Sequence, residues 1–518
     1  MLQLRSPAHA AEWLRGRVRG NLHTDSRKIN ASDGFIAWPG AATDGRQFVG
    51  QALLAGASAC VVESVGAEDF HFVDERVAAY AGLKAACGPI AAEFYQHPST
   101  QMDVLAITGT NGKTSTAWWL AQALHVLHQP AFDKLLLNSE LLAQCVCGLI
   151  GTLGIGFPGN MVFTGLTTPD PVMLQAQLQS MLRSGATACA VEASSIGVAE
   201  YRLDGTHIRA AIFTNFTQDH LDYHGSMGAY WQAKRALFDW PGLQVAVVNL
   251  DDPKGQELAQ HAAQRGLDVW TVSRVVGRAA RLQATDLCYS ETGMRFVVRE
   301  GQEQVQVNAP LLGDYNVSNL LGVLATLRAL GHNLQAACNA MRSLGAVPGR
   351  LECLILPDQP LVAVDYAHTP DALHKVLSAL RSATQARGGK LWCVFGCGGD
   401  RDASKRPLMA AAAEQGADHV VVTSDNPRGE AASAIIAQML PGLKNPTAVT
   451  YLVDRAQAIA QTIQNAAPSD VIVIAGKGHE DYQDIAGVKY PFSDMAHAQT
   501  ALHIRQQAPG MTQQERLA

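Results

Sequence analysis

Short apolar runs, each followed by a polar loop and then by a helical pattern, recur along most of this chain. "MDVLAITG" (residues 102–109), "ATACAVEAS", "RAAIFTNF", "KLWCVFGCGG" and "DVIVIAGKGHE" are examples. Such alternation predicts doubly wound parallel sheets with helices on both faces. Almost every unusual polar cluster directly follows a predicted strand, and ligands of open parallel sheets bind at that edge. The pattern therefore predicts an α/β protein with its sites at the carboxyl ends of strands.

The length of 518 residues exceeds what one hydrophobic core supports, so we expect three domains. "HPST" at 97–100 resembles a linker, and "VPGR" at 347–350 marks a second boundary. We therefore predict domains at residues 1–100, 101–346 and 347–518. A less regular stretch at about 275–310 has the pattern of antiparallel strands.

Composition narrows the class of protein. Hydrophobic residues make up 47% of the chain and charged residues 17%, with a formal net charge of −6, as in ordinary globular proteins. We find no basic stripe for nucleic acid, no apolar leader and no apolar run long enough for a bilayer. The ten Cys residues form no paired framework. The expectations are cytoplasmic localisation, reduced thiols, no nucleic-acid partner and no stable membrane association.

The stretch "ITGTNGKTS" has the form of a shortened phosphate-binding loop. It follows a predicted strand and opens a predicted helix, with Gly109, Gly112, Lys113 and Thr114 in place. Glycines let the backbone approach closely, and exposed N–H groups at a helix start favour anionic oxygens. Lys113 would reach the terminal phosphates and the Thr114 hydroxyl would bind Mg²⁺. An incidental Gly-rich turn is the alternative for the loop taken alone.

Acidic and imidazole side chains follow the next predicted strands. Glu192 ends one strand and can bind a hard cation, and Asp219 and His220 follow another. His220 and His224 have the spacing of one helix face, which leaves zinc as a weaker alternative without a third obvious ligand. Lys234 lies on a later predicted helix and, on residue type alone, is best explained as a solvated lysine.

Other polar clusters are ambiguous on residue type alone. Asn316 and Asn319 open a predicted helix, where they could be caps or contacts to a base. Arg401 lies in a Gly-rich loop. Arg428, in "DNPR", could clamp a carboxylate from a turn held by Pro427, or the segment could be a plain turn.

Taken together and in this order, the clusters resemble those of the Mur ligase family. The matching segments are "GTNGKTS", "VEASS", "TNFTQDHLDYHG…YWQAK", "LLGDYNVSN", "VPGRLE", "VDYAHTPDAL", "FGCGGDRD…KRP", "DNPR" and "AGKGHEDYQ". The resemblance implies a smaller α/β N-terminal domain that binds a UDP-linked substrate, a central ATP-binding domain, and a Rossmann-like C-terminal domain that brings in an amino acid. It implies that Lys234 is carbamylated and faces Mg²⁺, which replaces the interpretation as a solvated lysine.

Residue by residue, the resemblance implies four sets of site residues. The catalytic set is Lys113, Lys234, His220 and Arg350, and the metal set is Thr114, Glu192, His220 and Lys234. The ATP set is Gly109, Thr110, Asn111, Gly112, Lys113, Thr114, Ser115, Asn316, Asn319 and Asp365. The UDP-substrate set is Thr24, Ser26, Ala41, Ala42, Thr43, Thr167, Thr168, Ser194, Glu200 and Arg202. The set for the amino acid diaminopimelate is Arg401, Asp425, Asn426, Pro427, Arg428, Gly476 and Glu480.

The activity implied by the resemblance is an ATP-dependent ligation through an acyl phosphate. Its expected substrates are a UDP-muramoyl dipeptide, meso-2,6-diaminopimelate and ATP, with Mg²⁺ as cofactor and a monomer as the expected state. The rivals are the same reaction with L-lysine, a folylpolyglutamate-synthase-like ligase, and a nucleotide-switched binding protein. Two positions depart from the family pattern, because Ile196 replaces a frequent His and Glu200 a common Gln. The segment 128–147 is longer than expected and has no functional account.

Overall fold

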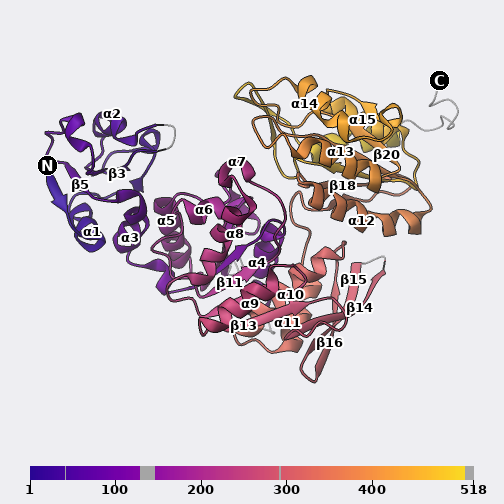
Figure 1. Cartoon of the computed structure of the whole chain (residues 1–518), viewed down its shortest axis with the longest axis horizontal. Helices are drawn as coiled ribbons and strands as arrows, with labels where there is room; N and C mark the ends of the chain where they lie inside the picture. The colour runs from indigo at the N-terminus through magenta and orange to yellow at the C-terminus, as the bar shows by residue number, and fades with distance from the viewer. Residues whose placement is uncertain (41–42, 129–145, 291–292, 508–518) are drawn as a thin grey trace, which may run out of the picture.

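The structure is a computed structural model that describes residues 1–40, 43–128, 146–290 and 293–507. Within these ranges the strands form three large sheets that follow one another in sequence, plus one small hairpin. Figure 1 shows the N-terminal sheet in indigo at one end, the central sheet in the middle, and the C-terminal unit in orange and yellow. The expected three-part α/β architecture is confirmed. Ala41 and Ala42 and most of the 128–147 segment lie outside the described residues.

The N-terminal sheet has five parallel strands in the order β1-β5-β4-β3-β2. Its strands are β1 (Leu2–Leu4), β2 (Leu22–His23), β3 (Gly34–Ala37), β4 (Ala59–Glu63) and β5 (Val77–Tyr80). Its helices are α1 (Pro7–Arg15), α2 (Val49–Leu54) and α3 (Leu83–Phe94). The last of these faces the central domain (Figure 1).

The central sheet has eleven strands in the order β16-β15-β14-β13-β12-β11-β6-β10-β7-β8-β9. Its parallel strands are β6 (Asp103–Thr108), β7 (Cys147–Gly151), β10 (Ala188–Glu192), β11 (Ala210–Phe213), β12 (Val245–Asn249) and β13 (Asp268–Ser273). At its edges are β8 (Gly154–Phe157), β9 (Asn160–Val162), β14 (Leu282–Ser290), β15 (Gly293–Glu300) and β16 (Glu303–Ala309). β14, β15 and β16 pair antiparallel, as expected for the stretch near 275–310.

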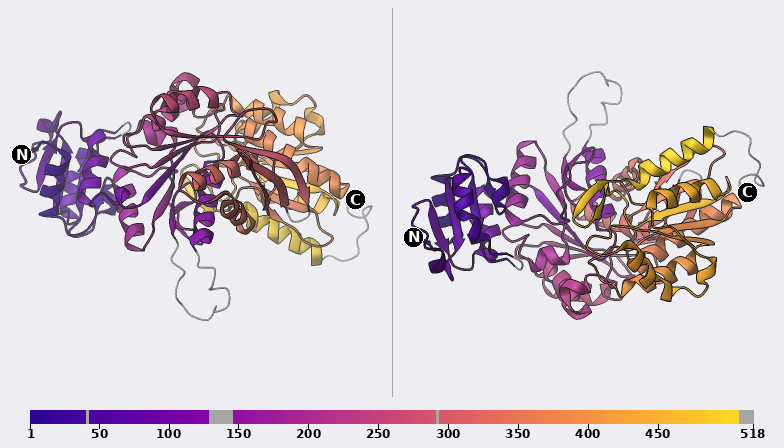
Figure 2. Two further views of the ribbon diagram at one scale, coloured as in Figure 1. Left: turned by 90° about the horizontal axis from the view of Figure 1, so that it is seen from below. Right: turned by 90° about the horizontal axis from the view of Figure 1, so that it is seen from above.

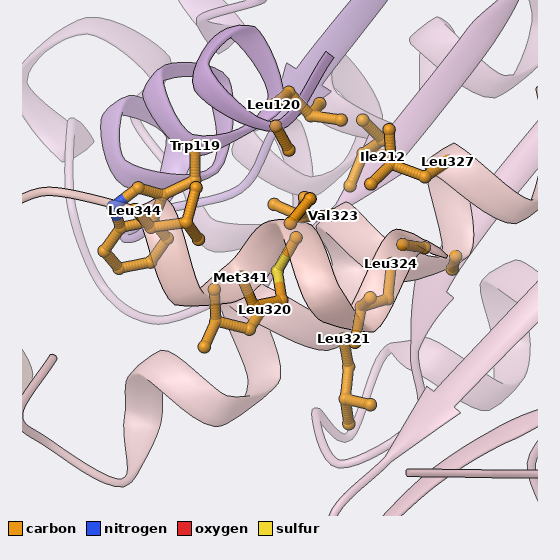
Figure 3. Close-up of a cluster of buried hydrophobic side chains, with 14 of the residues drawn as sticks. Trp119, Leu120, Ile212, Leu320, Leu321, Val323, Leu324, Leu327, Met341 and Leu344 are labelled. Carbon is orange, nitrogen blue, oxygen red and sulfur yellow. The ribbon is translucent and has the colours of Figure 1, made fainter. Parts of the chain in front are cut away.

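Helices cover both faces of the central sheet. They are α4 (Lys113–His128), α5 (Pro171–Arg183), α6 (Ser195–Ala199), α7 (Leu221–His224), α8 (Met227–Arg235), α9 (Gly255–Gln264), α10 (Tyr315–Ala329) and α11 (Leu334–Ala340). Alternate residues of β6 enter different cores, because Leu105 and Ile107 pack under α4 and α10 while Val104 and Ala106 pack on the opposite face. Figure 3 shows Trp119 and Leu120 of α4 above Leu320 and Val323 of α10.

The C-terminal sheet has six strands in the order β17-β18-β22-β19-β20-β21, all parallel except the antiparallel edge pair β17–β18. Its strands are β17 (Glu352–Leu354), β18 (Leu361–Asp365), β19 (Leu391–Phe395), β20 (His419–Val422), β21 (Thr450–Tyr451) and β22 (Val471–Ala475). Its helices are α12 (Pro370–Arg387), α13 (Lys405–Gly416), α14 (Ala432–Met439), α15 (Arg455–Asn465) and α16 (Asp494–Gln507). A hairpin of β23 (Tyr482–Ile485) and β24 (Val488–Pro491) follows β22.

The three units contact one another through specific polar bonds. Between the N-terminal and central units, Ser99 Oγ accepts from the His207 backbone N–H at 2.9 Å and the Gln179 side chain donates to the Tyr95 carbonyl at 2.8 Å. Between the central and C-terminal units, the Asn111 side chain donates to Asp371 at 3.0 Å. Figure 2 shows the three units in succession from two further sides. In the described part of the chain, we find no helix of sufficient length and apolarity to cross a bilayer.

A fully buried ion pair organises the C-terminal unit. Arg455 at the start of α15 and Asp494 at the start of α16 are both 0% exposed at their side chains, and Arg455 Nε and Nη2 each bond one carboxylate oxygen at 2.7 Å. Arg455 also donates to the carbonyls of Ser424 and Ala475, which follow β20 and end β22. The pair thus holds two strand ends that directly precede the predicted amino-acid site.

We predict that Asp494→Ala lowers the free energy of unfolding of the C-terminal domain by about 3–5 kcal/mol, because Arg455 would stay buried without its partner charge. Urea unfolding followed by tryptophan fluorescence measures the change. The double variant Arg455→Met/Asp494→Leu should recover much of the loss, since both charges are then removed. A loss below about 1 kcal/mol for Asp494→Ala would contradict the assignment.

Candidate active site at the edge of the central sheet

The phosphate loop connects the end of β6 to the start of α4 and brings its backbone very close to neighbouring elements. Gly109 has φ +143°, and a Cβ there would lie 1.9 Å from Thr214 Oγ1. Gly112 has φ +86°, and a Cβ there would lie 2.4 Å from Asn319 Oδ1. Both positions therefore require glycine, for conformation and for space. Gly112 and Asn319, both in the predicted ATP set, thus pack closely against one another.

Two lysines converge on one carbonyl oxygen of this loop. Lys113 Nζ donates to the carbonyls of Gly109 and Thr110 at 2.8 and 2.9 Å. Lys234 Nζ, from α8, also donates to the Gly109 carbonyl at 2.8 Å. Burial lowers the pKa of Lys113, although Glu192 and Asp219 counteract it. The amino groups of two lysines therefore meet at the phosphate loop, where they can donate to anionic oxygens.

Lys234 is buried, with a side chain in an environment that disfavours its charge. Its relative exposure is 1%, and its Nζ lies 4.4 Å from the centre of the Tyr230 ring. Burial, and then the charge of Lys113, lower the pKa of Lys234 well below its ordinary value. A lowered pKa increases the fraction of the lysine in its neutral amine form, which is the nucleophile. The structure excludes the solvated lysine that residue type alone suggested.

Glu192, at the end of β10, is buried beside the start of α4. Its Oε2 accepts from the Thr114 hydroxyl at 2.9 Å and from the Thr152 hydroxyl at 3.0 Å, and its Oε1 accepts from the Thr152 backbone N–H at 2.9 Å. Arg350 Nη2 lies 3.2 Å from Thr114 Oγ1. Hydroxyl and carboxylate oxygens side by side are the donors that Mg²⁺ prefers. This pair fits the predicted metal set.

Asp219 and His220 follow β11 and form a second charged group. His220 has φ +52°, and its Nε2 lies 3.5 Å from Asp219 Oδ2. His368 Nε2 and Lys405 Nζ of the C-terminal unit each lie 3.9 Å from Asp219. Burial raises the pKa of Asp219, but the charges of His368, His220 and Lys405 outweigh it and hold that pKa at about 2. Asp219 is therefore an anion between the two units.

Among the described residues, we find no cluster of three His, Cys, Asp or Glu side chains arranged to hold a metal ion. The predicted set combines Thr114, Glu192 and His220 with a lysine, so Glu192 is its one carboxylate when the lysine is unmodified. His224 Nε2 lies at hydrogen-bond distance, 3.0 Å, from Ser195 Oγ, so this nitrogen is not paired with His220 as a metal ligand. The geometry gives no support to the zinc alternative.

The central-domain part of the UDP-substrate set lies directly beside Glu192. The Thr168 hydroxyl donates to the Glu192 carbonyl at 2.6 Å and lies 2.9 Å from Ser194 Oγ. Thr167 Oγ1 lies 3.1 Å from Thr152 Oγ1. Arg202 Nη1 donates to the Thr168 carbonyl at 2.8 Å. Thr168 thus bonds Glu192 directly, and Ser194 and Arg202 are connected to Glu192 through Thr168. Thr167 is connected to Glu192 through Thr152.

The N-terminal part of that set lies after the ends of its strands. Thr24 follows β2 and lines a cavity of about 390 Å³ formed with α5 of the central unit. Ser26 opens a 3-10 turn capped by Asp25, and the Thr43 carbonyl accepts from Gly40 at 3.0 Å. Ala41 and Ala42 fall outside the described residues, so their assignment stays a prediction.

A cavity of about 410 Å³ lies between the phosphate loop and the C-terminal unit. The predicted ATP residues that line it are Asn111, Gly112, Thr114, Ser115, Asn316, Asn319 and Asp365, together with Arg350. Arg350 lies with its guanidinium carbon 4.5 Å from the Tyr366 ring centre and reaches Thr114. Burial raises the pKa of Asp365 to about 6, although Arg350 and two backbone N–H groups oppose the shift. The cavity size suits a nucleotide.

Asp365 also has a structural role. Its two carboxylate oxygens accept from the backbone N–H groups of Leu351 and Ala367, each at 2.7 Å. These bonds fix the chain segment that enters the C-terminal unit next to Arg350. Asp365 therefore shapes the cavity wall through the backbone, in addition to facing the cavity.

The predicted diaminopimelate residues gather at the carboxyl ends of β19, β20 and β22. The Asn426 side chain donates to Glu480 Oε2 at 2.7 Å, and Lys477 Nζ bonds both Asn426 Oδ1 at 2.9 Å and Glu480 Oε2 at 3.0 Å. Gly476 has φ +118°, and a Cβ there would lie 2.5 Å from Asp425 Oδ2. Asn426, Lys477 and Glu480 thus form one hydrogen-bonded group, and the Gly476 backbone packs closely against the Asp425 carboxylate.

Arg428 and Arg401 are held less tightly. Arg428 has φ +49°, follows the buried Pro427, and donates from Nη1 to the Gly399 carbonyl at 2.8 Å. Its backbone pairs with the β23–β24 hairpin at Asp484 and Ala486. Arg401 is exposed and donates to the Asp400 carbonyl at 2.9 Å. The Arg428 backbone is fixed while its half-buried guanidinium keeps donors for a ligand.

A smaller cavity connects the amino-acid residues to the phosphate-loop helix. About 210 Å³ in volume, it is lined by residues of both units: Trp118, Leu153, Met161, Phe163, Pro348, His479, Glu480 and Asp481. Trp118 lies one turn after Thr114 on α4. Trp118, Leu153 and Met161 also line a much smaller cavity together with Thr114 and Glu192. The space beside Glu480 therefore adjoins the candidate metal pair.

Several residues at the site are absent from the four sets predicted from the sequence. Thr152 orients Glu192 but lies in an unremarkable "GTLG" turn. His368 and Lys405 lie in the "YAHTP" and "KRP" segments, whose match to the family could have marked them. Lys477 lies in "AGKGHE", and its 0% exposure is a tertiary property without a local signal.

The chain is similar in sequence to known proteins along most of its length. Residues 107–327 match the model of the Mur ligase middle domain, and residues 349–478 match that of the Mur ligase glutamate ligase domain. A protein of Acidovorax sp. (strain JS42) named UDP-N-acetylmuramoyl-L-alanyl-D-glutamate–2,6-diaminopimelate ligase is 57% identical over 95% of this chain and 96% of its own. Its namesake from Janthinobacterium sp. (strain Marseille) is 46% identical over 96% and 97%.

A solved structure of a ligase with that same name is 35% identical, with a TM-score of 0.62 over 94% of this chain and 95% of its own. The family models cover more than half of the chain, and the relatives extend along nearly all of it. The chain therefore belongs to the Mur ligase family.

Proposed function

We propose that this protein is an ATP-dependent ligase that joins meso-2,6-diaminopimelate to the γ-carboxylate of the D-glutamate unit of UDP-N-acetylmuramoyl-L-alanyl-D-glutamate. The observation that carries the proposal is a pair of adjoining cavities that share Trp118, Leu153 and Met161. One is lined by Thr114 and Glu192 of the central unit, and the other by Glu480, which bonds Asn426 and Lys477 in the C-terminal unit. Relatives that bear the name of this activity extend along nearly the whole chain.

The first step is transfer of the γ-phosphoryl group. An oxygen of the substrate carboxylate forms a bond to the γ-phosphorus of ATP, the bond to the β-bridging oxygen breaks, and ADP leaves. Phosphoryl transfer needs alignment and charge neutralisation more than covalent help. Lys113 and the loop N–H groups supply positive charge, while Thr167, Thr168, Ser194 and Arg202 orient the carboxylate-bearing end beside them.

The second step forms the amide. The neutral amine of diaminopimelate attacks the acyl phosphate carbon, the C–O bond to phosphate breaks, and phosphate leaves as the nitrogen loses a proton. An acyl phosphate hydrolyses if water reaches it, so the central and C-terminal units must enclose it. Contacts from Asp219 to His368 and Lys405, and from Arg350 to Thr114, are the interactions by which this chain would keep the units closed.

Mg²⁺ fits the donor set of Thr114 and Glu192, with His220 and a carbamylated Lys234 completing it. When bound, the ion neutralises charge on the phosphate oxygens. The carbamate would form when the neutral Lys234 amine bonds to the carbon of CO₂ and gives up a proton. The lowered pKa of Lys234 and its burial beside Lys113 support this modification, because the product carries the negative charge that the site lacks.

Among the rivals, a folylpolyglutamate-synthase-like ligase would leave the N-terminal unit and its Thr24 cavity without a role. The use of L-lysine would leave Arg428 without a carboxylate partner. A nucleotide-switched binding protein would release ADP independently of an acceptor. ADP release measured with the UDP-substrate alone, the amino acid alone, and both together tests the proposal, which requires release to depend on both.

The phosphate loop generates the first prediction on activity. Lys113→Ala should lower kcat by at least about 10²–10³-fold, because a charge that contacts the transferred phosphate is lost. Steady-state ADP release measures this, and the unfolding temperature checks that the fold is retained. Lys254→Ala, which removes a surface lysine paired with Glu257, is the matched control. A fully active Lys113→Ala enzyme would contradict the assignment of ATP to this loop.

The second prediction on activity concerns Lys234. Lys234→Ala should be inactive, and a short carboxylic acid such as acetate or formate should restore part of the activity, because its oxygens replace those of the carbamate in the vacated space. In the native enzyme, ¹³CO₂ should give a carbamate resonance that is absent from Lys234→Ala. A native enzyme that turns over fully while lacking that resonance would rule out the modification.

The third prediction on activity concerns Arg428. Diaminopimelate has a distal carboxylate that lysine lacks, and a guanidinium can bind it through two charge-assisted bonds. Arg428→Ala should raise the KM for diaminopimelate by the equivalent of about 2–5 kcal/mol and leave the KM for ATP nearly unchanged. Native enzyme should use L-lysine very poorly. Equal use of both amino acids by the native enzyme would refute the specificity while leaving the ligase class intact.

A further inference from the structure

An ion pair joins the N-terminal unit to the predicted substrate-binding edge of the central unit. Lys84 Nζ, near the start of α3, lies 2.6 Å from Glu200 Oε2, which directly follows α6. The Tyr223 hydroxyl donates to the other Glu200 oxygen from α7. Side-chain exposures of 40% for Lys84 and 31% for Glu200 place the pair at the rim of the interface rather than in a core.

Close backbone packing holds Lys84 in reach of Glu200. Gly88 lies one helical turn after Lys84 on the same face of α3, and a Cβ there would lie 2.0 Å from the carbonyl oxygen of Asp204. Gly205, with φ +80°, packs its own backbone against Gly88 and Pro89. The helix that carries Lys84 is therefore pressed directly against the loop that follows Glu200 and Arg202.

The charge of Glu200 matters because of its neighbours. Arg202 lies two residues further on and donates to the Thr168 carbonyl within the predicted substrate set. Hydrogen bonds from Lys84 and Tyr223, and then the charges of Lys84 and Arg202, lower the pKa of Glu200, so its carboxylate is ionised at neutral pH. An ionised carboxylate beside Arg202 opposes the binding of a second carboxylate there.

We propose that Lys84 neutralises Glu200 across the domain interface, so that Arg202 remains available to a carboxylate of the UDP-muramoyl dipeptide. With Lys84, the three charged groups sum to +1; without it, Arg202 and Glu200 cancel. This assigns Lys84 as a positioning residue supplied by the N-terminal unit, and it makes a substrate-binding contact dependent on the docking of that unit. The inference rests on the proposed function, since it concerns the anionic substrate of that site.

The test is a double-variant cycle of Lys84→Met, Glu200→Gln and the two combined, with the KM for each of the three substrates measured separately. Lys84→Met should raise the KM for the UDP-substrate about three- to tenfold, with kcat and the constants for ATP and diaminopimelate within about twofold, as expected for a partly exposed charge. Adding Glu200→Gln to Lys84→Met should reverse most of that rise. The rise should also shrink as ionic strength increases.

Arg76→Met is the matched control, because Arg76 forms a partly exposed 2.6 Å ion pair with Asp74 in the same unit, within its own loop. It should leave the KM for the UDP-substrate unchanged, while the unfolding temperature of each variant reports on the fold. A rise for Lys84→Met that the Glu200→Gln addition fails to reverse would overturn the proposal, as would an equal rise for all three substrates. Absence of any turnover of the UDP-substrate by the native enzyme would instead refute the proposed function.

Discussion

The carbonyl oxygen of Gly109 accepts hydrogen bonds from the buried amino groups of Lys113 and Lys234, and the site is organised around this contact. This contact depends on glycine at position 109, because its φ is positive and its backbone packs directly against Thr214. Any side chain there would separate the loop from the end of β11. A positive charge on either group is poorly compensated here, and burial lowers the pKa of both lysines. Such an arrangement is costly for an empty protein and favourable once anionic oxygens are bound.

The same constraint explains how the three units depend on one another. Thr114, one residue after Lys113, contacts Glu192 on the adjacent strand and Arg350 at the entry to the C-terminal unit. Asp219, which helps to balance both lysines, also faces His368 and Lys405. At the other end of the site, Lys84 reaches Glu200 from the N-terminal unit. Each unit thus contributes charge to a site whose chemistry needs all three.

The C-terminal unit contains two kinds of charged residue: a buried ion pair that fixes the backbone, and arginines whose side chains are partly exposed. The Arg455–Asp494 pair fixes the backbone at Ser424 and Ala475, immediately before Asp425 and Gly476. Lys477 and Asn426 then orient Glu480. Arg428 and Arg401, by contrast, bond only backbone carbonyls through their guanidinium groups in the described structure, so their donors can turn to a ligand. Buried charge positions the strand ends, and half-buried charge is left for recognition.

Local pattern in the sequence was sufficient for the α/β class, the antiparallel stretch near 275–310, the glycine-dependent phosphate loop and the placement of polar clusters at strand ends. These follow from hydrophobic periodicity and from backbone conformations that only certain residues adopt. Lys234 shows the limit, since its burial beside Lys113 depends on how α8 packs against the loop, and residue type alone indicated a solvated side chain. Lys84, Thr152 and Lys477 lie far in sequence from Glu200, Glu192 and Asn426, which they respectively contact. Only the tertiary structure decides such contacts, because the pairing of charges depends on distances that chain order does not contain.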